Sequence, residues 1–392
     1  MKSFFVGGYR KYLLITFALL TSYFIFTQMI QNRNSVAQIC AAKAYRLNDS
    51  DLKLLQSKSY FIAVLFRNSE KVLSAWMEEF PRLVQLLSNQ DRSEQRSNIF
   101  ISLHGSGIDK TSVYLEKFRN MFADLGIETD IQSDSDWDSF IRESNELHRI
   151  ERLAWLRNTA LRRFTSLTSS SSSSLSHFDR VLFLNDIFFC AENILQLVLS
   201  SIQTKSDVSC GMDYYRQYKK RRILGFYDVW VARDMNGKRF TTSPPYAVTP
   251  ASIDALAKGQ TFQVRSCWNG AVSINAEVFS GQDSALFRSS RSGECEVSEC
   301  EFFMRDLVSR GRTHISIVPS CTTAYNIEDF EELKRQMSFA RIKNPTLGST
   351  KALITWRDDR PIEWECCPMR RNDSYVNWDL CHMQTNWSQS IF

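Results

Sequence analysis

The stretch FDRVLFLNDIFFC, residues 178–190, contains an apolar run that ends abruptly in two polar residues. The run from Val181 to Leu184 is typical of a fully buried strand. It stops at Asn185 and Asp186, after which apolar residues resume. Burying an amide or a carboxylate without a partner costs about 2 kcal/mol or more. A turn, a helix start or a ligand must therefore satisfy this pair.

Alternating strand and helix patterns precede this stretch. Tyr60–Phe66 predicts a buried strand, and residues 70–89 carry apolar side chains at helical spacing. Asn98–Leu103 predicts a second strand, residues 112–126 a second amphipathic helix and residues 127–134 a third strand. This alternation predicts an α/β fold with a parallel sheet that is covered on both faces.

Polar residues follow the predicted strands at the edge where such sheets bind ligands. They are Arg67 and Asn68 after the first strand, His104 and Ser106 in the Gly-rich loop HGSG after the second, and Asn185 and Asp186. Arg157 and Asn158 lie on a predicted helix before the fourth strand. A guanidinium group matches phosphate oxygens in a bidentate manner, so we expect these residues to contact a phosphate or a sugar hydroxyl.

Asp186 is the candidate metal ligand. Mg²⁺ and Mn²⁺ prefer hard oxygen ligands and usually take one or two carboxylates together with phosphate oxygens. The pattern predicts that Asp186 holds such a cation against a diphosphate. An Asx-turn at Asn185-Asp186, or a cap on the helix that begins with AENILQLVL, explains the same residues equally well.

The second half of the chain is less regular and richer in aromatic residues. Tyr227, Asp228 and Trp230 lie in FYDVWVARDMNG, and Trp268 and Asn269 lie in SCWNG. Aromatic rings suit the apolar face of a sugar, so these residues are candidates for binding an acceptor. Packing in the core is the alternative for each of them.

The N-terminus predicts a membrane anchor. Basic residues precede an uncharged run of 19 residues, Tyr12–Ile30, which as a helix spans roughly 30 Å. A cleaved signal peptide is the alternative, but its apolar core is about 7–15 residues. The basic flank predicts a cytosolic N-terminus and a lumenal body. The expected order is tail 1–11, anchor 12–30, stem 31–58, catalytic domain 59–335 and C-terminal extension 336–392.

Cysteine and sequon content fit a secretory compartment. None of the ten cysteines shows the C-x-x-C spacing of a zinc site, so several are expected to form disulfides. The adjacent Cys366 and Cys367 should bond to different partners. Glycosylation sequons occur at Asn48, Asn372 and Asn386.

Composition argues against one class of partner. The net charge of +5 is mild, and KKRR at 219–222 is interpreted as a solvated loop, so no nucleic-acid partner is expected. Six consecutive serines, Ser169–Ser174, cannot pack in a core and predict a flexible surface loop.

Seven segments occur in the order found in fungal capsule-associated α-1,3-mannosyltransferases, and the chain resembles this family over residues 58–335. The segments are YFIAVLFRNSE, NIFISLHGSGIDKT, LRNTAL, RVLFLNDIFFCAENILQLV, CGMDYY with FYDVWVARDMNG, SCWNGAVSINAEVF and SECEFFMRDL. The resemblance implies an A-type glycosyltransferase fold with a Rossmann-like, mostly parallel sheet. It also implies a GDP-mannose donor, an α-mannoside or mannan acceptor, and a type II protein of the Golgi or ER membrane.

The resemblance implies a reaction that retains configuration at the donor carbon. Asn185-Asp186 would stand in for the Asp-x-Asp motif with a single carboxylate, which leaves the need for Mn²⁺ or Mg²⁺ open. Glu299 and Asp234 are the candidates for a carboxylate beside the anomeric carbon. An inactive transferase-like scaffold or a glycan-binding protein is the alternative function. A metal-dependent hydrolase would need clustered carboxylates or histidines, which the sequence does not show.

Overall fold

The protein is described by a computed structural model in ten stretches of the chain. They are residues 35–41, 47–88, 97–133, 148–169, 177–217, 223–280, 284–343, 354–360, 363–369 and 376–385. Among these residues, no helix is both long enough and apolar enough to cross a bilayer. The predicted anchor at residues 12–30, the sequons Asn372 and Asn386, and the serine tract beyond Ser169 lie outside the described residues.

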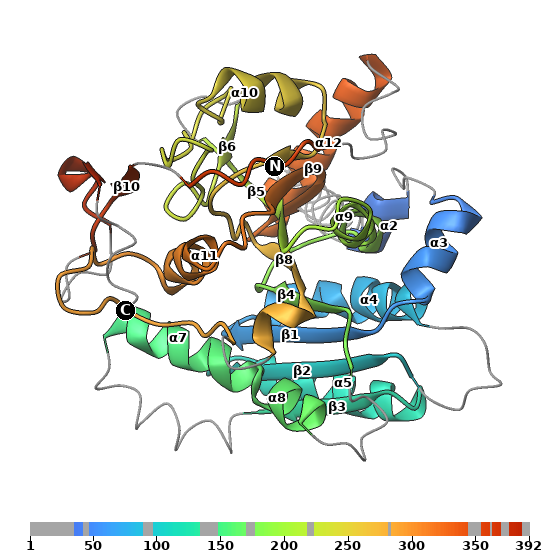
Figure 1. Cartoon of the computed structure of the whole chain (residues 1–392). Helices are drawn as coiled ribbons and strands as arrows, with labels where there is room; N and C mark the ends of the chain where they lie inside the picture. Colours follow the sequence, from blue (N-terminus) through green and yellow to red (C-terminus); the bar gives the residue numbers. More distant parts are fainter. Residues whose placement is uncertain are drawn as a thin grey trace, which may run out of the picture.

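A nine-stranded sheet organises the fold, in the order β3-β2-β1-β4-β8-β5-β9-β7, with β6 paired to β5 (Figure 1). The strands are β1 Tyr60–Arg67, β2 Ile99–Ser106, β3 Glu128–Gln132, β4 Arg180–Leu184, β5 Val208–Arg216, β6 Leu224–Phe226, β7 Phe262–Gln263, β8 Ala271–Asn275 and β9 Ile315–Ala324. The strands β3, β2, β1 and β4 are mutually parallel, and β9 is parallel to β5. Strand β8 runs antiparallel between β4 and β5, so these two strands point the same way. The prediction of an α/β fold with a mostly parallel sheet is confirmed.

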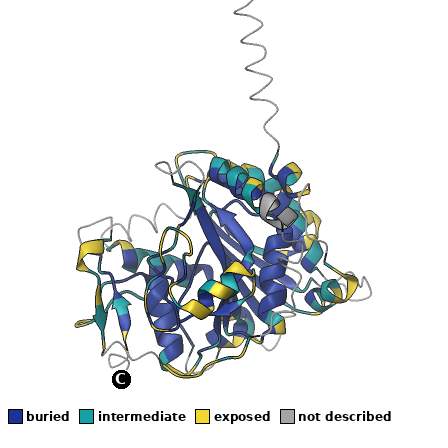
Figure 2. Ribbon diagram, turned by 90° about the horizontal axis from the view of Figure 1, so that it is seen from above, coloured by how far each residue is buried: buried dark blue, intermediate teal, exposed yellow. Residues whose placement is uncertain are grey.

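Helices cover the sheet, and the buried strands lie between helices whose outer faces are exposed (Figure 2). The main helices are α4 Glu70–Leu87, α5 Thr111–Asp124, α7 Arg149–Ala160, α8 Arg162–Thr168, α9 Ala191–Gln203, α10 Pro250–Ala257, α11 Glu299–Ser309 and α12 Ile327–Lys343. Helix α4 packs on α5 and α9, while α7 packs on β1, β2 and α11. The apolar stripe predicted for residues 70–89 accounts for this packing, because Leu73, Trp76 and Phe80 are all buried in the core.

The second strand is longer than its apolar run predicts. The pairing of β1 with β2 continues as far as Arg67 opposite Ser106, so His104 and Ser106 belong to the strand. The predicted Gly-rich loop therefore begins only after Ser106. Hydrogen bonds to a neighbouring strand extend a strand through polar residues, which hydrophobic periodicity alone does not reveal.

The folded unit begins before residue 59. Two helices, α2 Val36–Ala41 and α3 Asp49–Gln56, pack on α4. Ile39 and Leu55 are buried in the core, and Cys40 is bonded to Cys190. The described residues of the predicted stem, 35–41 and 47–58, thus pack on the domain, because their apolar side chains are buried against the helices. Asn48, the described sequon, is exposed and caps α3.

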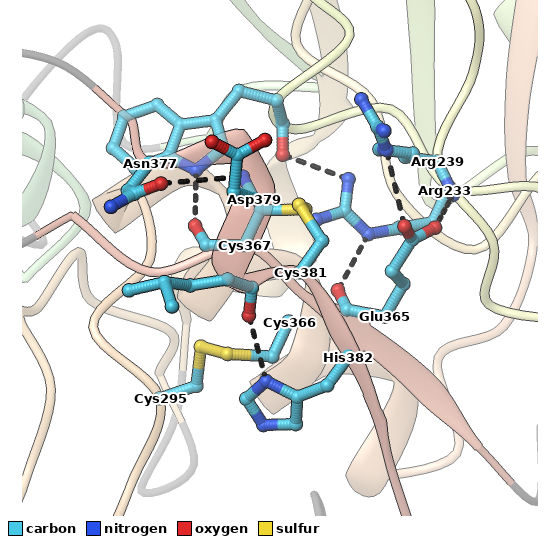
Figure 3. The surroundings of a disulfide bond; sticks show 12 residues. Arg233, Arg239, Cys295, Glu365, Cys366, Cys367, Asn377, Asp379, Cys381 and His382 are labelled. Atoms are coloured by element: carbon cyan, nitrogen blue, oxygen red, sulfur yellow. Dashed lines mark hydrogen bonds and ion pairs between the residues drawn. A yellow bond between two sulfur atoms is a disulfide. The ribbon is translucent and has the colours of Figure 1, made fainter.

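The described C-terminal residues also belong to the fold. A hairpin of β10 Trp364–Cys366 and β11 His382–Gln384 is held by two disulfides, Cys295–Cys366 and Cys367–Cys381 (Figure 3). The prediction that Cys366 and Cys367 bond to different partners is confirmed. A fourth bond joins Cys210 to Cys267. The described hairpin of the predicted C-terminal extension is thus joined to the rest of the domain through Cys295–Cys366.

Candidate active site at the carboxyl edge of the sheet

The ends of several strands bring polar side chains to one edge of the sheet. Because β1, β4, β5 and β9 run in the same direction, their carboxyl ends lie at this edge, and the antiparallel β8 begins there. The ligands of α/β sheets bind at this edge. The residues described below come from these strand ends and from α7 and α11.

Asn185 is a structural link within the site. Its backbone N–H donates to the carbonyl of Gly270 at 2.8 Å. Its side-chain amide donates to the hydroxyl of Tyr325 at 2.9 Å, and its carbonyl oxygen accepts from the indole N–H of Trp268 at 3.1 Å. Both ends of the amide are therefore occupied by the protein, and Asn185 fixes two aromatic residues in place.

Asp186 has a different environment. It is partly exposed, and the hydroxyl of Ser69 donates to one carboxylate oxygen at 3.2 Å. Burial raises the pKa of Asp186, although the hydrogen bond from Ser69 and the charge of Arg157 act in the opposite direction. Helix α9 begins at Ala191 with Cys190 as its cap, so neither Asn185 nor Asp186 caps it. The helix-cap explanation of this pair is therefore wrong.

The residues around Asp186 fit a cation that takes most of its ligands from elsewhere. In the described part of the chain, a group of three close potential ligands occurs only at Glu365, Cys367 and Cys381, and these cysteines are bonded to each other. Asp186 thus offers one carboxylate. A single carboxylate with phosphate oxygens and water is a usual set for Mg²⁺, so the site fits a cation brought together with a diphosphate.

Three arginines lie close together at this edge. Arg67 ends β1, and Arg149 and Arg152 lie in the first turn of α7. Burial lowers the pKa of Arg152, and the charges of Arg67 and Arg149 lower it further. Among the described residues, neither Arg67 nor Arg152 forms an ion pair. Like charges held together without carboxylates are arranged for an anionic ligand.

Arg157 is enclosed by the protein. Its Nε donates to Glu299 Oε1 at 2.9 Å, and its guanidinium lies over the ring of Trp268 at 4.5 Å from the centroid. Glu299 is only 2% exposed. The predicted phosphate contact of Arg157 and the predicted catalytic role of Glu299 are therefore not supported, because each group already satisfies the other. The adjacent Asn158 pairs with both backbone groups of Phe287.

Two neighbouring acidic residues, Asp213 and Asp228, interact electrostatically in the site. Asp213 lies on β5, and Asp228 follows β6; the backbone N–H of Asp228 donates to Asp213 Oδ1 at 3.1 Å. The carboxylate of Asp228 accepts from the backbone N–H groups of Val231 at 3.3 Å and Asn269 at 3.1 Å. Burial raises the pKa of Asp228 to about 6. Burial and the charge of Asp228 raise the pKa of Asp213 well above its usual range.

The predicted acceptor residues separate into exposed and buried groups. Tyr227 is 56% exposed, and its ring lies on that of Tyr325 with centroids 4.8 Å apart. Trp268 and Asn269 are buried, so they shape the site without facing a ligand. The indole of Trp230 donates to the carbonyl of Cys367 and supports the C-terminal hairpin. The sequence pattern alone does not show which aromatic residues are exposed for stacking on a sugar and which pack in the core.

Other residues that the sequence predicts to contact a ligand are instead engaged by contacts within the protein. Asp234 is fully buried and accepts the backbone N–H groups of Asn236 and Lys238, both at 2.9 Å, so it holds a turn. The ring of His104 is buried beside Ser102 at 3.1 Å and Asp130 at 3.5 Å. Ser106 is buried at the end of β2. Asn68, in the left-handed region with φ of 52°, binds the backbone N–H of Ile108.

Sequence reasoning missed five residues of this site. They are Ser69, Arg149, Arg152, Asp213 and Tyr325. Asp213 and Tyr325 occupy the carboxyl ends of β5 and β9, where the same strand-end rule applies. Neither strand follows the strand–helix alternation of the first half, so the sequence pattern does not reveal where these strands end.

Comparison with known proteins identifies the family to which this chain belongs. The family model described as "Cryptococcal mannosyltransferase 1" matches residues 59–306. The α-1,3-mannosyltransferase CMT1 of Cryptococcus neoformans var. neoformans serotype D is 28% identical over 292 residues. The match covers 68% of this chain and 60% of that relative, so the chain spans less than two thirds of its length.

Solved structures of S. aureus TarS also match. The structure of TarS has a TM-score of 0.35 at 14% identity, covering 73% of this chain and 40% of that one. TarS 1–349 in complex with UDP has the same TM-score and identity, covering 73% of this chain and 66% of that one.

Proposed function

We propose that this chain, which belongs to the cryptococcal mannosyltransferase 1 family, transfers mannose from GDP-mannose to an α-mannoside or mannan acceptor through an α-1,3 linkage. The family match over residues 59–306 includes Asp186, Arg152 and Asp228 and therefore covers most of the site. The observation that carries the proposal is the position of Asp186 at the end of β4, near both the arginine cluster and the two carboxylates. The charges of Arg149, Asp186, Asp213 and Asp228 all act on Tyr227. We also propose that the sheet domain has an A-type glycosyltransferase fold.

The three arginines of the site suit the negative charge of a nucleoside diphosphate. Arg67, Arg149 and Arg152 would contact phosphate oxygens and stabilise the negative charge that grows on the departing GDP. Asp186 would hold Mn²⁺ or Mg²⁺, which when bound supplies further neutralisation of the diphosphate. Arg157 is held by its ion pair with Glu299, so it would add positive charge to the site without contacting the donor.

The aromatic and acidic residues of the site suit a sugar with its hydroxyl groups. Tyr227 offers an exposed ring, and the partly exposed Asp228 offers oxygens that can accept hydrogen bonds. Sugar recognition commonly combines an aromatic face with such polar groups. We infer that the acceptor lies between Tyr227 and Asp186, facing the donor.

The cellular location is also proposed. A type II protein of the Golgi or ER membrane, with its sheet domain in the lumen, is supported by the charge pattern of residues 1–30. The disulfide bonds of the described residues agree with an oxidising compartment.

Turnover by the full-length chain tests the function. The chain would be incubated with Mn²⁺, α-mannobiose and each of several nucleotide sugars, and GDP or UDP release and the product linkage would be measured. We expect release with GDP-mannose only, and an α-1,3-linked product of retained configuration. Binding of mannobiose without nucleotide release from any donor would contradict the proposal and favour a glycan-binding protein.

A further inference from the structure

The carboxylates of the site differ in whether a ligand can reach them. Asp213 is fully buried and Glu299 nearly so, and Glu299 is closed by its ion pair with Arg157. Asp186 and Asp228 are both partly exposed. The charge of Arg157 acts to lower the pKa of Asp186. In the proposed function, Asp186 holds a cation against the diphosphate. Asp228 is therefore the carboxylate that remains for a sugar.

Asp228 is held in one orientation by the backbone. Its two oxygens each accept one backbone N–H, from Val231 and Asn269. A carboxylate oxygen has two lone-pair sites, so each oxygen can accept a further donor. Asn269 adopts a left-handed φ of 49°, and its amide donates to the carbonyl of Gly211 at 2.9 Å. A strained residue fixed in this way is typical of a preorganised site.

Asp213 is buried next to Asp228. Its Oδ2 atom and the hydroxyl of Thr323 form no hydrogen bond of normal geometry with the described residues, although the hydroxyl of Tyr325 lies near enough to Asp213 to lower its pKa. Both residues flank Gly270, where a Cβ atom would lie 2.9 Å from Thr323 Oγ1 and 3.6 Å from Asp213 Cβ. Buried polar groups without full hydrogen bonding are rare, and a role in catalysis is one explanation of them.

We propose that Asp228 accepts a hydrogen bond from the attacking hydroxyl of the acceptor mannoside, whose ring lies on Tyr227, and that Asp213 positions Asp228. This proposal rests on the proposed function. In the transfer, the acceptor oxygen bonds to the anomeric carbon as the bond from that carbon to the diphosphate oxygen breaks. The hydroxyl proton passes to Asp228 as the new bond forms, and Asp228 then releases it to water, so the carboxylate is regenerated while the diphosphate leaves as an anion.

The charges around Asp228 set its pH response. Asp213 faces it from β5, Glu299 and Cys300 from α11, Arg233 from its own loop, and Tyr325 from the end of β9. Asp228 has a pKa of about 6, and burial together with the charge of Asp228 raises the pKa of Asp213 well above its ordinary value. Near neutral pH, Asp228 is thus ionised, and the raised pKa of Asp213 favours its protonated form. The kcat/KM for the acceptor should rise as pH increases through about 6.

Asp228→Asn tests the contact directly. We expect kcat/KM for α-mannobiose to fall about 100-fold and its rise near pH 6 to disappear. Hydrolysis of GDP-mannose by water and the affinity for GDP should stay within twofold, which also shows that the variant is folded. Unchanged transfer, or an equal loss of transfer, hydrolysis and GDP affinity, would overturn the proposal. Asp254→Asn, the same change at an exposed carboxylate on α10, should leave all three unchanged.

Two substitutions at Asp213 test the positioning role. Asp213→Asn resembles the protonated side chain, so kcat/KM and its pH profile should stay close to those of the native protein. Asp213→Ala leaves the Asp228 N–H without its acceptor, so kcat/KM for the acceptor should fall about tenfold with unchanged GDP affinity. An Asn variant as damaged as the Ala variant would overturn this role. If the native chain shows no turnover of GDP-mannose, the proposed function itself fails, and not this inference alone.

Discussion

Asn185 and Asp186 are adjacent in the sequence but have different surroundings. Asn185 binds Trp268 and Tyr325 through both ends of its amide, whereas Asp186 receives a hydrogen bond from Ser69 and remains partly exposed. The sequence predicts that this pair needs partners. It could not predict which residue takes protein partners, because Trp268 and Tyr325 lie 83 and 140 residues away from Asn185.

Arg152 provides a residue-scale test of the diphosphate side. In Arg152→Gln we expect the KM for GDP-mannose to rise about tenfold, because a charge-assisted hydrogen bond is lost. Stability should be unchanged or slightly higher, since Arg152 lies among like charges without an ion-pair partner in the described chain. Donor kinetics and urea unfolding would be measured together, with Arg335→Gln on α12 as the control. A less stable variant with an unchanged KM would show that Arg152 is structural.

Among the elements, the first half of the sheet could be predicted and the second half could not. Strands β1, β2, β3 and β4 alternate with helices, so apolar runs and helical spacing reveal them. In the second half, β8 runs antiparallel between β4 and β5, and the two-residue strand β7 follows α10 and pairs antiparallel with β9. Local patterns do not indicate which distant strand pairs with which, and the carboxylate side of the site depends on those pairings.

Helix α11 depends on a buried carboxylate. Glu299 and Glu301, both in the first turn of α11, are buried. Glu301 binds Arg233 at 2.8 Å and Arg305 at 2.7 Å, and it also accepts from the indole of Trp364 at 2.8 Å. These contacts join α11 to the C-terminal hairpin, since the guanidinium of Arg233 also donates to the carbonyl of Glu365 (Figure 3).

Glu301→Gln should therefore destabilise the protein by about 3 kcal/mol, because two buried guanidinium groups lose their counter-charge. Urea unfolding of the full chain measures this change. Glu332→Gln removes a carboxylate from the pair with the exposed Arg335 on α12, and it should cost less than about 1 kcal/mol. A loss below 1 kcal/mol for Glu301→Gln would contradict the importance of this cluster.

At the scale of the whole molecule, disulfides connect the ends of the described chain to the sheet domain. Cys40–Cys190 joins α2 to the residue before α9 across a separation of 150 residues, whereas Cys367–Cys381 closes a separation of 14. The chain-entropy model gives stabilisations of about 5 and about 3 kcal/mol for loops of these lengths. A fragment that begins at residue 59 would lose the longer loop together with α2 and α3.

Paired Cys→Ala variants test this closure. Removing Cys40 and Cys190 should lower the free energy of unfolding by about 2 kcal/mol more than removing Cys367 and Cys381. Guanidinium unfolding of the two full-length variants provides the comparison. Equal losses, or a larger loss for the shorter loop, would show that the helices α2 and α3 need no covalent closure.

In the proposed function, Asp186 serves catalysis at the carboxyl edge of the sheet. The decisive test is the turnover of GDP-mannose by Asp186→Asn, measured with and without Mn²⁺ together with the melting temperature. We expect turnover to fall about 100-fold, a barrier increase of roughly 3 kcal/mol. The melting temperature should hardly change, because an amide oxygen can still accept from Ser69 and no helix depends on this residue. Near-native turnover with an unchanged response to Mn²⁺ would contradict the account.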